Sequence, residues 1–306
     1  MHAAPTETIQ RDPHGSRWRL REGNEIAPGL SALKLLGGGL RYEAYLAWDA
    51  RLYSMVVVKV VRPGLVDDAR TLAGLAEEVE MLGRLHHPVL VRSFGADLDG
   101  PRPHVVLEHL EGPRLSTLVR KYGPLPAEQL LPLALQLCAA VHYLAREGVV
   151  HLDIKPSNII MGAPARLIDL SVARTTEECR HLRSAVGTDS YMAPEQCLPE
   201  EGAPVGPAAD VWGIGVTLYR AVAGERPYEK GDPDAPHPHE RWPQLVSAPE
   251  PLPDKVPLAI ADPIMGCLAY DPADRPSATE LADALEPVLG ALPRPWVSKL
   301  KPRVRF

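Results

Sequence analysis

A short polar run at residues 151–158 brings together side chains that a group-transfer reaction needs. Its sequence is His-Leu-Asp-Ile-Lys-Pro-Ser-Asn, in which Asp153 can accept a proton from a hydroxyl group. Lys155 can neutralise a transferring phosphate, and Asn158 can ligate a metal. A further carboxylate, Asp169, follows a short apolar run and suits Mg²⁺. The pattern indicates metal-assisted phosphoryl transfer.

A lysine inside the apolar run at residues 56–61 points to the same chemistry. Burying an unpaired ammonium group is costly, so Lys59 needs a carboxylate partner, and Glu78 on the next predicted helix can supply one. Alternatively, the lysine extends to solvent from an edge strand. Gly37, Gly38 and Gly39 could let a backbone approach phosphates, although such a run is more often a simple hairpin.

The elements that must position these residues change in kind along the chain. Residues before Gly112 are expected to form one helix at 72–85 and strands at 33–36, 42–48, 56–61 and 104–110. Later residues are expected to form helices at 127–146, 208–222, 258–269 and 278–289. The Pro-rich stretch 231–257 is expected to be an irregular surface excursion. A small strand-rich lobe therefore precedes a larger helical lobe, and ligands commonly bind between such lobes.

The motifs occur in the order of a known family. They are Gly37 and Gly39, Lys59, Glu78, Asp153, Asn158, Asp169 and Ala193-Pro194-Glu195. With these residues the chain resembles the protein kinases, specifically the bacterial members of the eukaryotic-like (Hanks-type) Ser/Thr family. The resemblance runs from about residue 30 to 289, and the motifs taken together are very specific.

The resemblance implies an α+β, bilobed fold, with a small antiparallel β-sheet N-lobe, one main N-lobe helix and a larger, mainly helical C-lobe. The implied domain organisation is a flexible segment at 1–28, a kinase domain at 29–291 and a basic tail at 292–306. Within the kinase domain the N-lobe would span about 29–110 and the C-lobe about 111–291.

The resemblance also implies catalytic roles. Lys59, held by Glu78, would orient the α- and β-phosphates of ATP. Asp153 would align and deprotonate a Ser or Thr hydroxyl of a protein substrate, and Lys155 would offset charge on the γ-phosphoryl group.

The ligands implied by the resemblance are ATP and Mg²⁺, with Mn²⁺ as a possible substitute. Asn158 and Asp169 would hold the metal. The remaining implied ATP-binding residues line the glycine-rich loop, the roof over adenine, the interlobe connection and the floor of the site: Leu36, Gly37, Gly38, Gly39, Ala44, Val57, Lys59, Leu107, Glu108, His109, Leu110 and Ile160.

Matches farther along the chain imply structural roles. Asp210 matches an aspartate of a central helix, and Arg275 matches the arginine that pairs with Glu195 in the family. The Lys155-Pro156 pair and Thr188 are typical of the Ser/Thr subgroup.

Three of the departures from the family pattern bear on the phosphate-covering loop and the activation switch. Tyr42 stands where the third glycine is usual, so the loop would be stiffer and its side chain could crowd the phosphates. Leu152 replaces the arginine that pairs with an activation-loop phosphate, which suggests that activity does not depend strongly on that pairing. Ser171 replaces a flexible glycine after Asp169. The candidate phosphorylation sites in this loop are Thr175, Thr176 and Ser184.

These departures leave an alternative open, a pseudokinase-type scaffold that binds nucleotide or a partner with little turnover. A small-molecule kinase is a third possibility, but Ala193-Pro194-Glu195, Asp210 and Arg275 argue against it because they build a platform for a protein substrate.

Composition and charge bear on the partners, the location and the cysteine chemistry of the protein. The formal net charge of −6 argues against a nucleic-acid partner, and no run of apolar residues suggests a membrane span. The four cysteines have no metal-ligand spacing, so free thiols in a cytoplasmic protein are expected, with a redox switch at Cys179 and Cys197 as the weaker alternative. A regulatory partner or a dimer is a further possibility.

Overall fold

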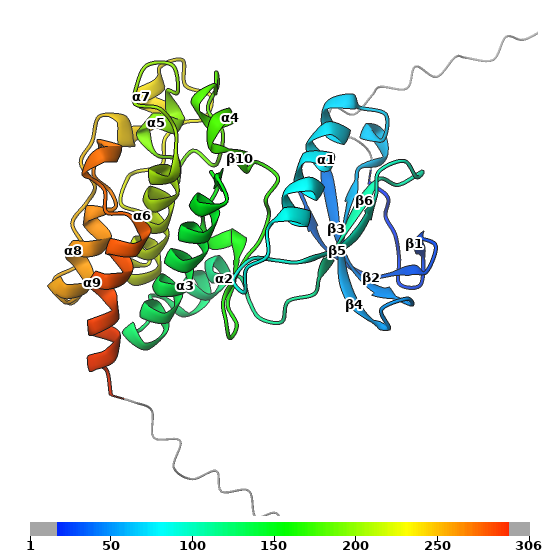
Figure 1. Ribbon diagram of the computed structural model, residues 1–306, viewed down its shortest axis with the longest axis horizontal. Helices are drawn as coiled ribbons and strands as arrows, with labels where there is room; N and C mark the ends of the chain where they lie inside the picture. Colours follow the sequence, from blue (N-terminus) through cyan, green and yellow to red (C-terminus); the bar gives the residue numbers. More distant parts are fainter. Residues whose placement is uncertain (1–16, 294–306) are drawn as a thin grey trace, which may run out of the picture. The chain divides into compact units, whose positions relative to one another are not determined.

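The computed structural model describes residues 17–293, which divide into two compact units (Figure 1). The first unit consists of the described residues up to Pro113 together with Ile159–Ala173, and the second consists of Arg114–Asn158 and the described residues from Arg174 onward. The expected division assigned residues 159–173 to the helical lobe. They belong instead with the sheet, because the backbone of Leu167 bonds to Val89 and Val91.

The first unit is built on a six-stranded antiparallel sheet in the order β1-β2-β3-β4-β6-β5. The strands are β1 (Glu25–Ala27), β2 (Leu30–Gly38), β3 (Tyr42–Asp49), β4 (Ser54–Val61), β5 (Ser93–Asp97) and β6 (His104–Glu108). The remaining elements are η1 (Pro63–Leu65), α1 (Ala69–Arg84) and a small pair of strands, β8 (Ile159–Ile160) and β9 (Arg166–Leu167).

The alternation of β4 separates the two faces of this sheet. Val56, Val58 and Val60 are fully buried on one face, and because successive side chains point in opposite directions, Val57 and Lys59 lie on the other. The strand register places further predicted ATP-binding side chains on that second face. Ala44 lies opposite Lys59, and Leu107 lies opposite Val57.

The first face is closed by residues that were expected to be flexible. Ile26 of β1 is 1 % exposed, and Trp18 packs against the same apolar cluster as Val58. The indole nitrogen of Trp18 also donates to the carbonyl of Val61 at 2.7 Å. The predicted flexible segment is therefore wrong for residues 17–28, which bury apolar surface on the sheet, and its earlier part lies outside the described residues.

The second unit is mainly helical. Its helices are α2 (Leu115–Tyr122), α3 (Ala127–Arg146), α4 (Thr176–Arg180), α5 (Pro194–Cys197), α6 (Pro207–Ala223), α7 (Pro238–Arg241), α8 (Leu258–Gly266) and α9 (Ala278–Ala291). Its shorter elements are β7 (Val149–Val150), η2 (Pro156–Asn158), β10 (Arg174–Thr175), η3 (Pro243–Leu245) and η4 (Pro272–Asp274). α3 packs against α6 and α9, and most of α6 is buried, so these helices form the core that supports the loops.

The Pro-rich stretch is only partly the surface excursion that was expected. Its middle forms α7 and η3, where Trp242 is 7 % and Gln244 is 4 % exposed. Trp242 packs with Met192 and Cys197 in a small apolar cluster. The expectation is wrong there because composition reports the many prolines but not the two side chains that anchor the stretch.

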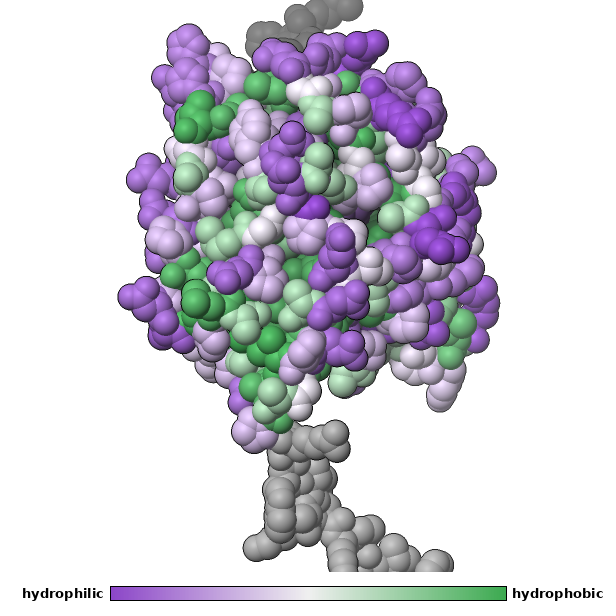
Figure 2. All heavy atoms as spheres, turned by 60° about the vertical axis from the view of Figure 1, so that its left-hand side comes forward, coloured by the Kyte–Doolittle hydropathy of each residue, from purple (hydrophilic) through white to green (hydrophobic). Residues whose placement is uncertain are grey.

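The surface of the described residues carries mixed character. Hydrophilic residues cover much of the face in Figure 2, with hydrophobic residues in smaller areas between them. Isolated exposed apolar side chains such as Val246 and Leu258 are normal for a folded domain. Between residues 17 and 293, no helix has both the length and the apolar character needed to cross a membrane.

Candidate active site

The first unit contains a buried ion-pair cluster around Lys59. The Lys59 ammonium lies 2.9 and 2.7 Å from the two carboxylate oxygens of Glu78 and 2.9 Å from Oδ1 of Asp169. β4 lies between β3 and β6, which excludes the alternative of an edge-strand lysine. Burial alone would lower the pKa of Lys59, but the carboxylates of Glu78 and Asp169 outweigh it and raise that pKa. Lys59 therefore stays charged at neutral pH.

Two features of α1 fix the position of Glu78 beside Lys59: the cap at the start of the helix and the buried apolar stripe along it. The Asp68 side chain caps the helix by accepting from the backbone N–H of Thr71 at 2.8 Å. Leu75 and Leu82 are buried on the same stripe as Glu78, at helical spacing, so the apolar packing of α1 fixes the carboxylate as well.

Tyr42 adds a contact to this cluster that the sequence did not predict. The Lys59 ammonium lies 4.8 Å from the centre of the Tyr42 ring, and the Tyr42 hydroxyl donates to the carbonyl of Thr71 in α1 at 3.0 Å. Burial raises the pKa of this hydroxyl, so it remains a donor at neutral pH. Tyr42 thus links the glycine-rich loop to Lys59 and to α1.

The glycine-rich loop depends on glycine at two of its positions. Gly37 has φ +152°, which L residues rarely adopt, and a Cβ on Gly38 would lie 2.7 Å from the carbonyl oxygen of Tyr42. A Cβ on Gly39 would meet no atom within 4 Å. The hairpin itself therefore requires the first two glycines, and the space beside Gly39 is open to a ligand.

Of the remaining predicted nucleotide contacts, Ala44, Val57 and Leu107 lie on the Lys59 face of the sheet. Ala44 and Val57 are half-buried, and Leu107 is 9 % exposed. His109 and Leu110 follow the end of β6, and Ile160 lies in β8 of the same unit. Ala44, Val57 and Leu107 offer an apolar surface beside a charged lysine, which suits a base attached to a phosphate chain.

The side chain of Glu108 is occupied by contacts with two arginines of its own unit. Its carboxylate accepts from the backbone N–H of Arg92 at 2.7 Å and contacts the guanidinium groups of Arg92 and Arg166. A role for Glu108 at the nucleotide would therefore be carried by its backbone.

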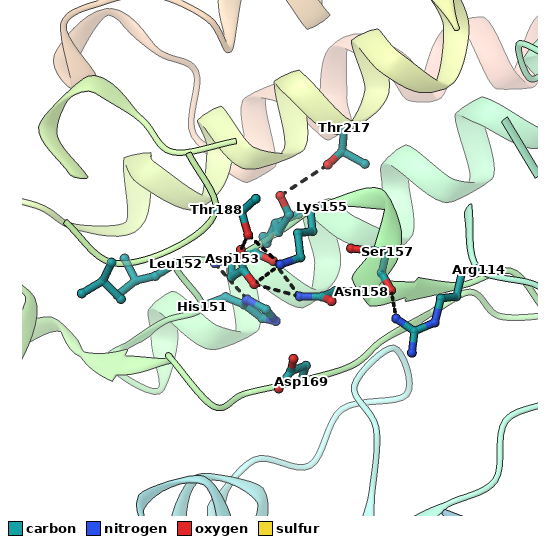
Figure 3. A network of polar contacts seen from close by, with 12 residues as sticks. Arg114, His151, Leu152, Asp153, Lys155, Ser157, Asn158, Asp169, Thr188 and Thr217 are labelled. Carbon is teal, nitrogen blue, oxygen red and sulfur yellow. Dashed lines mark hydrogen bonds and ion pairs between the residues drawn. The ribbon is translucent and has the colours of Figure 1, made fainter. Parts of the chain in front are cut away.

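In the second unit, one hydrogen-bonded network joins Asp153, Lys155, Asn158 and Thr188 (Figure 3). The Lys155 ammonium lies 2.6 Å from Oδ2 of Asp153 and 2.6 Å from the Thr188 hydroxyl. That hydroxyl donates to Oδ1 of Asp153 at 2.7 Å, and the Asn158 amide donates to Oδ2 at 3.1 Å. Both carboxylate oxygens are thus held in place, as a base that must align a hydroxyl group requires.

The backbone around Asp153 is fixed by another buried carboxylate. Asp210 of α6 accepts from the N–H groups of His151 and Leu152 at 2.7 and 2.9 Å. Leu152 has φ +65°, an unusual value for a residue with a Cβ, and its side chain is buried and points away from the network. The strained backbone is held by these bonds and by Gln196, which donates to the Leu152 carbonyl at 2.9 Å.

The two candidate metal ligands are oxygen donors in different units. The Asn158 nitrogen donates to Asp153, which leaves its amide oxygen as the donor for a cation. Asp169, whose φ is +72°, is followed by Leu170, which is 2 % exposed and fills the apolar position after it. The described residues contain no group of three or more His, Cys, Asp or Glu that could hold a metal unaided. Asn158 and Asp169 each offer an oxygen donor of the kind that Mg²⁺ prefers in proteins.

The candidate phosphorylation sites lie at or near α4. Thr175 caps α4 and exchanges hydrogen bonds with Glu178, Thr176 is the first residue of that helix, and Ser184 is exposed. Arg275 lies elsewhere in the second unit and donates twice to Glu195, at 2.7 and 2.8 Å, as its match to the family implied.

Sequence reasoning missed the functional placement of two residues. Thr188 was noted only as typical of a subgroup, yet its hydroxyl lies between Asp153 and Lys155. Its position in the segment before Ala193 was the signal that could have placed it in the site. Tyr42 was expected to crowd a ligand, and nothing in its spacing reveals the contact with Lys59.

Comparisons with known proteins agree with this geometry. The pattern of the protein kinase domain matches residues 30–285. The chain is 32 % identical over 281 residues to the serine/threonine-protein kinase pkn2 of Myxococcus xanthus. This match covers 85 % of this chain and 32 % of that protein. It is 30 % identical over 203 residues to PknB of Mycobacterium leprae, covering 63 % of this chain and 32 % of that protein. It is 33 % identical over 241 residues to PkaA of Streptomyces coelicolor, a match that covers 76 % of this chain and 43 % of that protein.

The chain spans about a third of the length of the first two relatives. The matched region includes both units and confirms the fold class predicted from the motifs, an antiparallel sheet with one main helix followed by a mainly helical part. The family uses ATP and a divalent metal ion. The chain belongs to the protein kinase domain family, and it resembles the bacterial Ser/Thr, Hanks-type members of that family.

Proposed function

We propose that this chain is an ATP- and Mg²⁺-dependent protein kinase that phosphorylates Ser or Thr hydroxyls of proteins. The observation that carries the proposal is the network that fixes both oxygens of Asp153 through Lys155, Thr188 and Asn158. The names of the relatives support the same activity.

In this proposal each group acts through position and charge. Asp153 aligns the attacking hydroxyl and takes its proton, while Lys155 offsets charge on the transferred phosphoryl group. Lys59, held by Glu78, orients the α- and β-phosphates. Asn158 and Asp169 hold the metal ion, which when bound neutralises phosphate charge.

The domain boundaries follow from the same proposal. We take the kinase domain to run from about 29 to 291, with residues 17–28 added to its sheet because β1 lies there. The basic tail proposed for 292–306 falls almost wholly outside the described residues, from 294 onward.

The proposal also covers the compartment in which the protein works and the regulation of its activity. A cytoplasmic setting is supported by four free cysteines, which are common in reducing compartments. Control by a regulatory partner or by dimerisation is supported by Leu152, because an apolar residue cannot bind an activation-loop phosphate.

A transfer assay tests the proposed function. The purified chain should transfer labelled γ-phosphate from ATP·Mg²⁺ to itself or to a generic basic protein. Lys59→Met and Asp169→Asn should each abolish transfer while circular dichroism shows an intact fold. A wild-type chain that binds ATP but transfers no more label than Asp169→Asn would contradict the proposal and favour the scaffold alternative.

A further inference from the structure

Asp189 is held by side chains of the Pro-rich stretch. Arg241 donates to both of its carboxylate oxygens, from Nε and Nη2, each at 3.1 Å. The indole nitrogen of Trp242 donates to Oδ1 at 3.0 Å. A planar guanidinium that makes two parallel bonds to a carboxylate fixes its orientation as well as its distance.

The same stretch also holds the backbone around Asp189. Gln244 donates to the carbonyl oxygens of Asp189 and Met192, at 2.7 and 3.1 Å, and its side chain is buried. Trp242 packs against Met192 in the small apolar cluster described above. We call residues 238–245, which comprise α7 and η3, the anchoring segment.

Asp189 is one peptide bond from the catalytic network. Thr188 precedes it directly, and the Thr188 hydroxyl contacts both Asp153 and Lys155. Consecutive Cα atoms are held about 3.8 Å apart, so a shift of Asp189 moves Thr188 with it. Misplacing catalytic groups by about 1 Å can cost about a hundredfold in rate.

We infer that Arg241, Trp242 and Gln244 are positioning residues, which hold Asp189 and through it set the Thr188 hydroxyl against Asp153. This inference rests on the proposed kinase function. The side chains of Arg241 and Asp189 are 39 % and 30 % exposed, and such partly exposed pairs contribute little to stability. The contribution of the ion pair is therefore to geometry and should appear in the transfer step.

Arg241→Met, Arg241→Lys and Asp189→Asn test the inference through kinetics. Arg241→Met should lower kcat for peptide phosphorylation by about ten- to a hundredfold, with the KM for ATP and the melting temperature unchanged. Arg241→Lys should recover part of the loss, because it keeps the positive charge but cannot make the two parallel hydrogen bonds to Asp189. The double variant Arg241→Met/Asp189→Asn should be no slower than the slower single variant, because both changes break one interaction.

Arg183→Met is the matched control. Arg183 is an exposed arginine of the same unit whose carboxylate partner is Glu200, at 2.9 Å. Its replacement should leave kcat unchanged.

Hydrogen exchange gives a readout that does not depend on activity. In Arg241→Met, the amides of residues 187–192 should exchange faster than in the wild type, while those of α3 and α6 stay protected. An active wild type with unchanged kcat in Arg241→Met would overturn the inference and leave the kinase function standing. A wild type without transfer would overturn the proposed function, and unchanged exchange at 187–192 would then still overturn the anchoring role.

Discussion

At the scale of single residues, Tyr42 replaces a glycine of the family pattern and yet joins the machinery around Lys59. Its ring lies beside the Lys59 ammonium, and its hydroxyl bonds to the Thr71 carbonyl of α1. A glycine at this position could make neither contact. The Tyr42 side chain therefore ties the loop to α1 and lies against the Lys59 ammonium that pairs with Glu78.

Replacing Tyr42 should lower kcat/KM for ATP, by less in Tyr42→Phe than in Tyr42→Gly. Tyr42→Phe removes a hydrogen bond that contributes about 1 kcal/mol, and Tyr42→Gly also removes a cation–π contact of about 0.5–2 kcal/mol. Because about 1.4 kcal/mol corresponds to a tenfold change in rate, Tyr42→Gly should lower kcat/KM for ATP by about tenfold or more, and Tyr42→Phe by less.

Tyr53→Phe is the control for this series, since Tyr53 is 81 % exposed and belongs to the same unit. It should leave kcat/KM for ATP unchanged. An increase in kcat/KM for Tyr42→Gly would mean that the ring obstructs the nucleotide.

Leu152 leads to a prediction about the candidate phosphorylation sites. Its apolar side chain is buried and offers no cation for a phosphate. The triple variant with Thr175, Thr176 and Ser184 changed to Ala should therefore keep its kcat in the transfer assay. Loss of the Thr175 cap should cost only about 1 kcal/mol of helix stability.

Asp153→Asn is the inactive reference for that assay, and mass spectrometry would report which hydroxyls carry phosphate. A triple variant as inactive as Asp153→Asn would show that phosphorylation of this loop is required after all.

At the scale of elements, the second unit positions its loops through buried polar contacts. Asp210 of α6 holds the backbone N–H groups of His151 and Leu152. Arg275 joins Glu195 of α5 to the carbonyls of Ala208 and Ala269. The Arg275 guanidinium also lies 4.9 Å from the Trp212 ring. Through Arg275, these contacts join α5 to the first turn of α6 and to the residues just before η4.

Breaking the ion pair between Glu195 and Arg275 should destabilise the protein strongly. The two side chains are 2 % and 0 % exposed, and removing one partner of such a pair typically costs about 3–5 kcal/mol. Glu195→Gln should lower the free energy of unfolding in urea by that amount. Glu200→Gln, the same change in an exposed ion pair, should cost under about 1 kcal/mol. Equal losses for the two variants would refute the structural role of the buried pair.

At the scale of the whole molecule, burial decides how the cysteines behave. All four are buried and free, and burial raises the pKa of Cys138 and of Cys179 to about 12. It raises the pKa of Cys197 and Cys267 as well. Few thiolates exist at neutral pH under these conditions, so the structure gives no support to a redox switch at Cys179 and Cys197.

Periodicity and local chemistry were enough to predict much of the fold. α3 begins and ends at the predicted residues, because an apolar stripe at helical spacing needs little tertiary help to be recognised. β4 and Lys59 were recognised for a related reason, since a lone charge in a β-branched run is rare and costly.

The family and the principal helices and strands could be predicted from the amino-acid sequence, because residue types and spacing carry that information locally, and the residues assigned to the chemistry follow from the same motifs as a prediction. Three sets of contacts could be seen only in the folded structure: Trp18 and Ile26 cover the sheet, Tyr42 lies against Lys59, and the anchoring segment holds Asp189. These contacts join residues far apart in the chain, and their energies depend on burial and on distances within a few tenths of an ångström. Neither composition nor spacing contains those quantities, which arise when the folded backbone brings the side chains together.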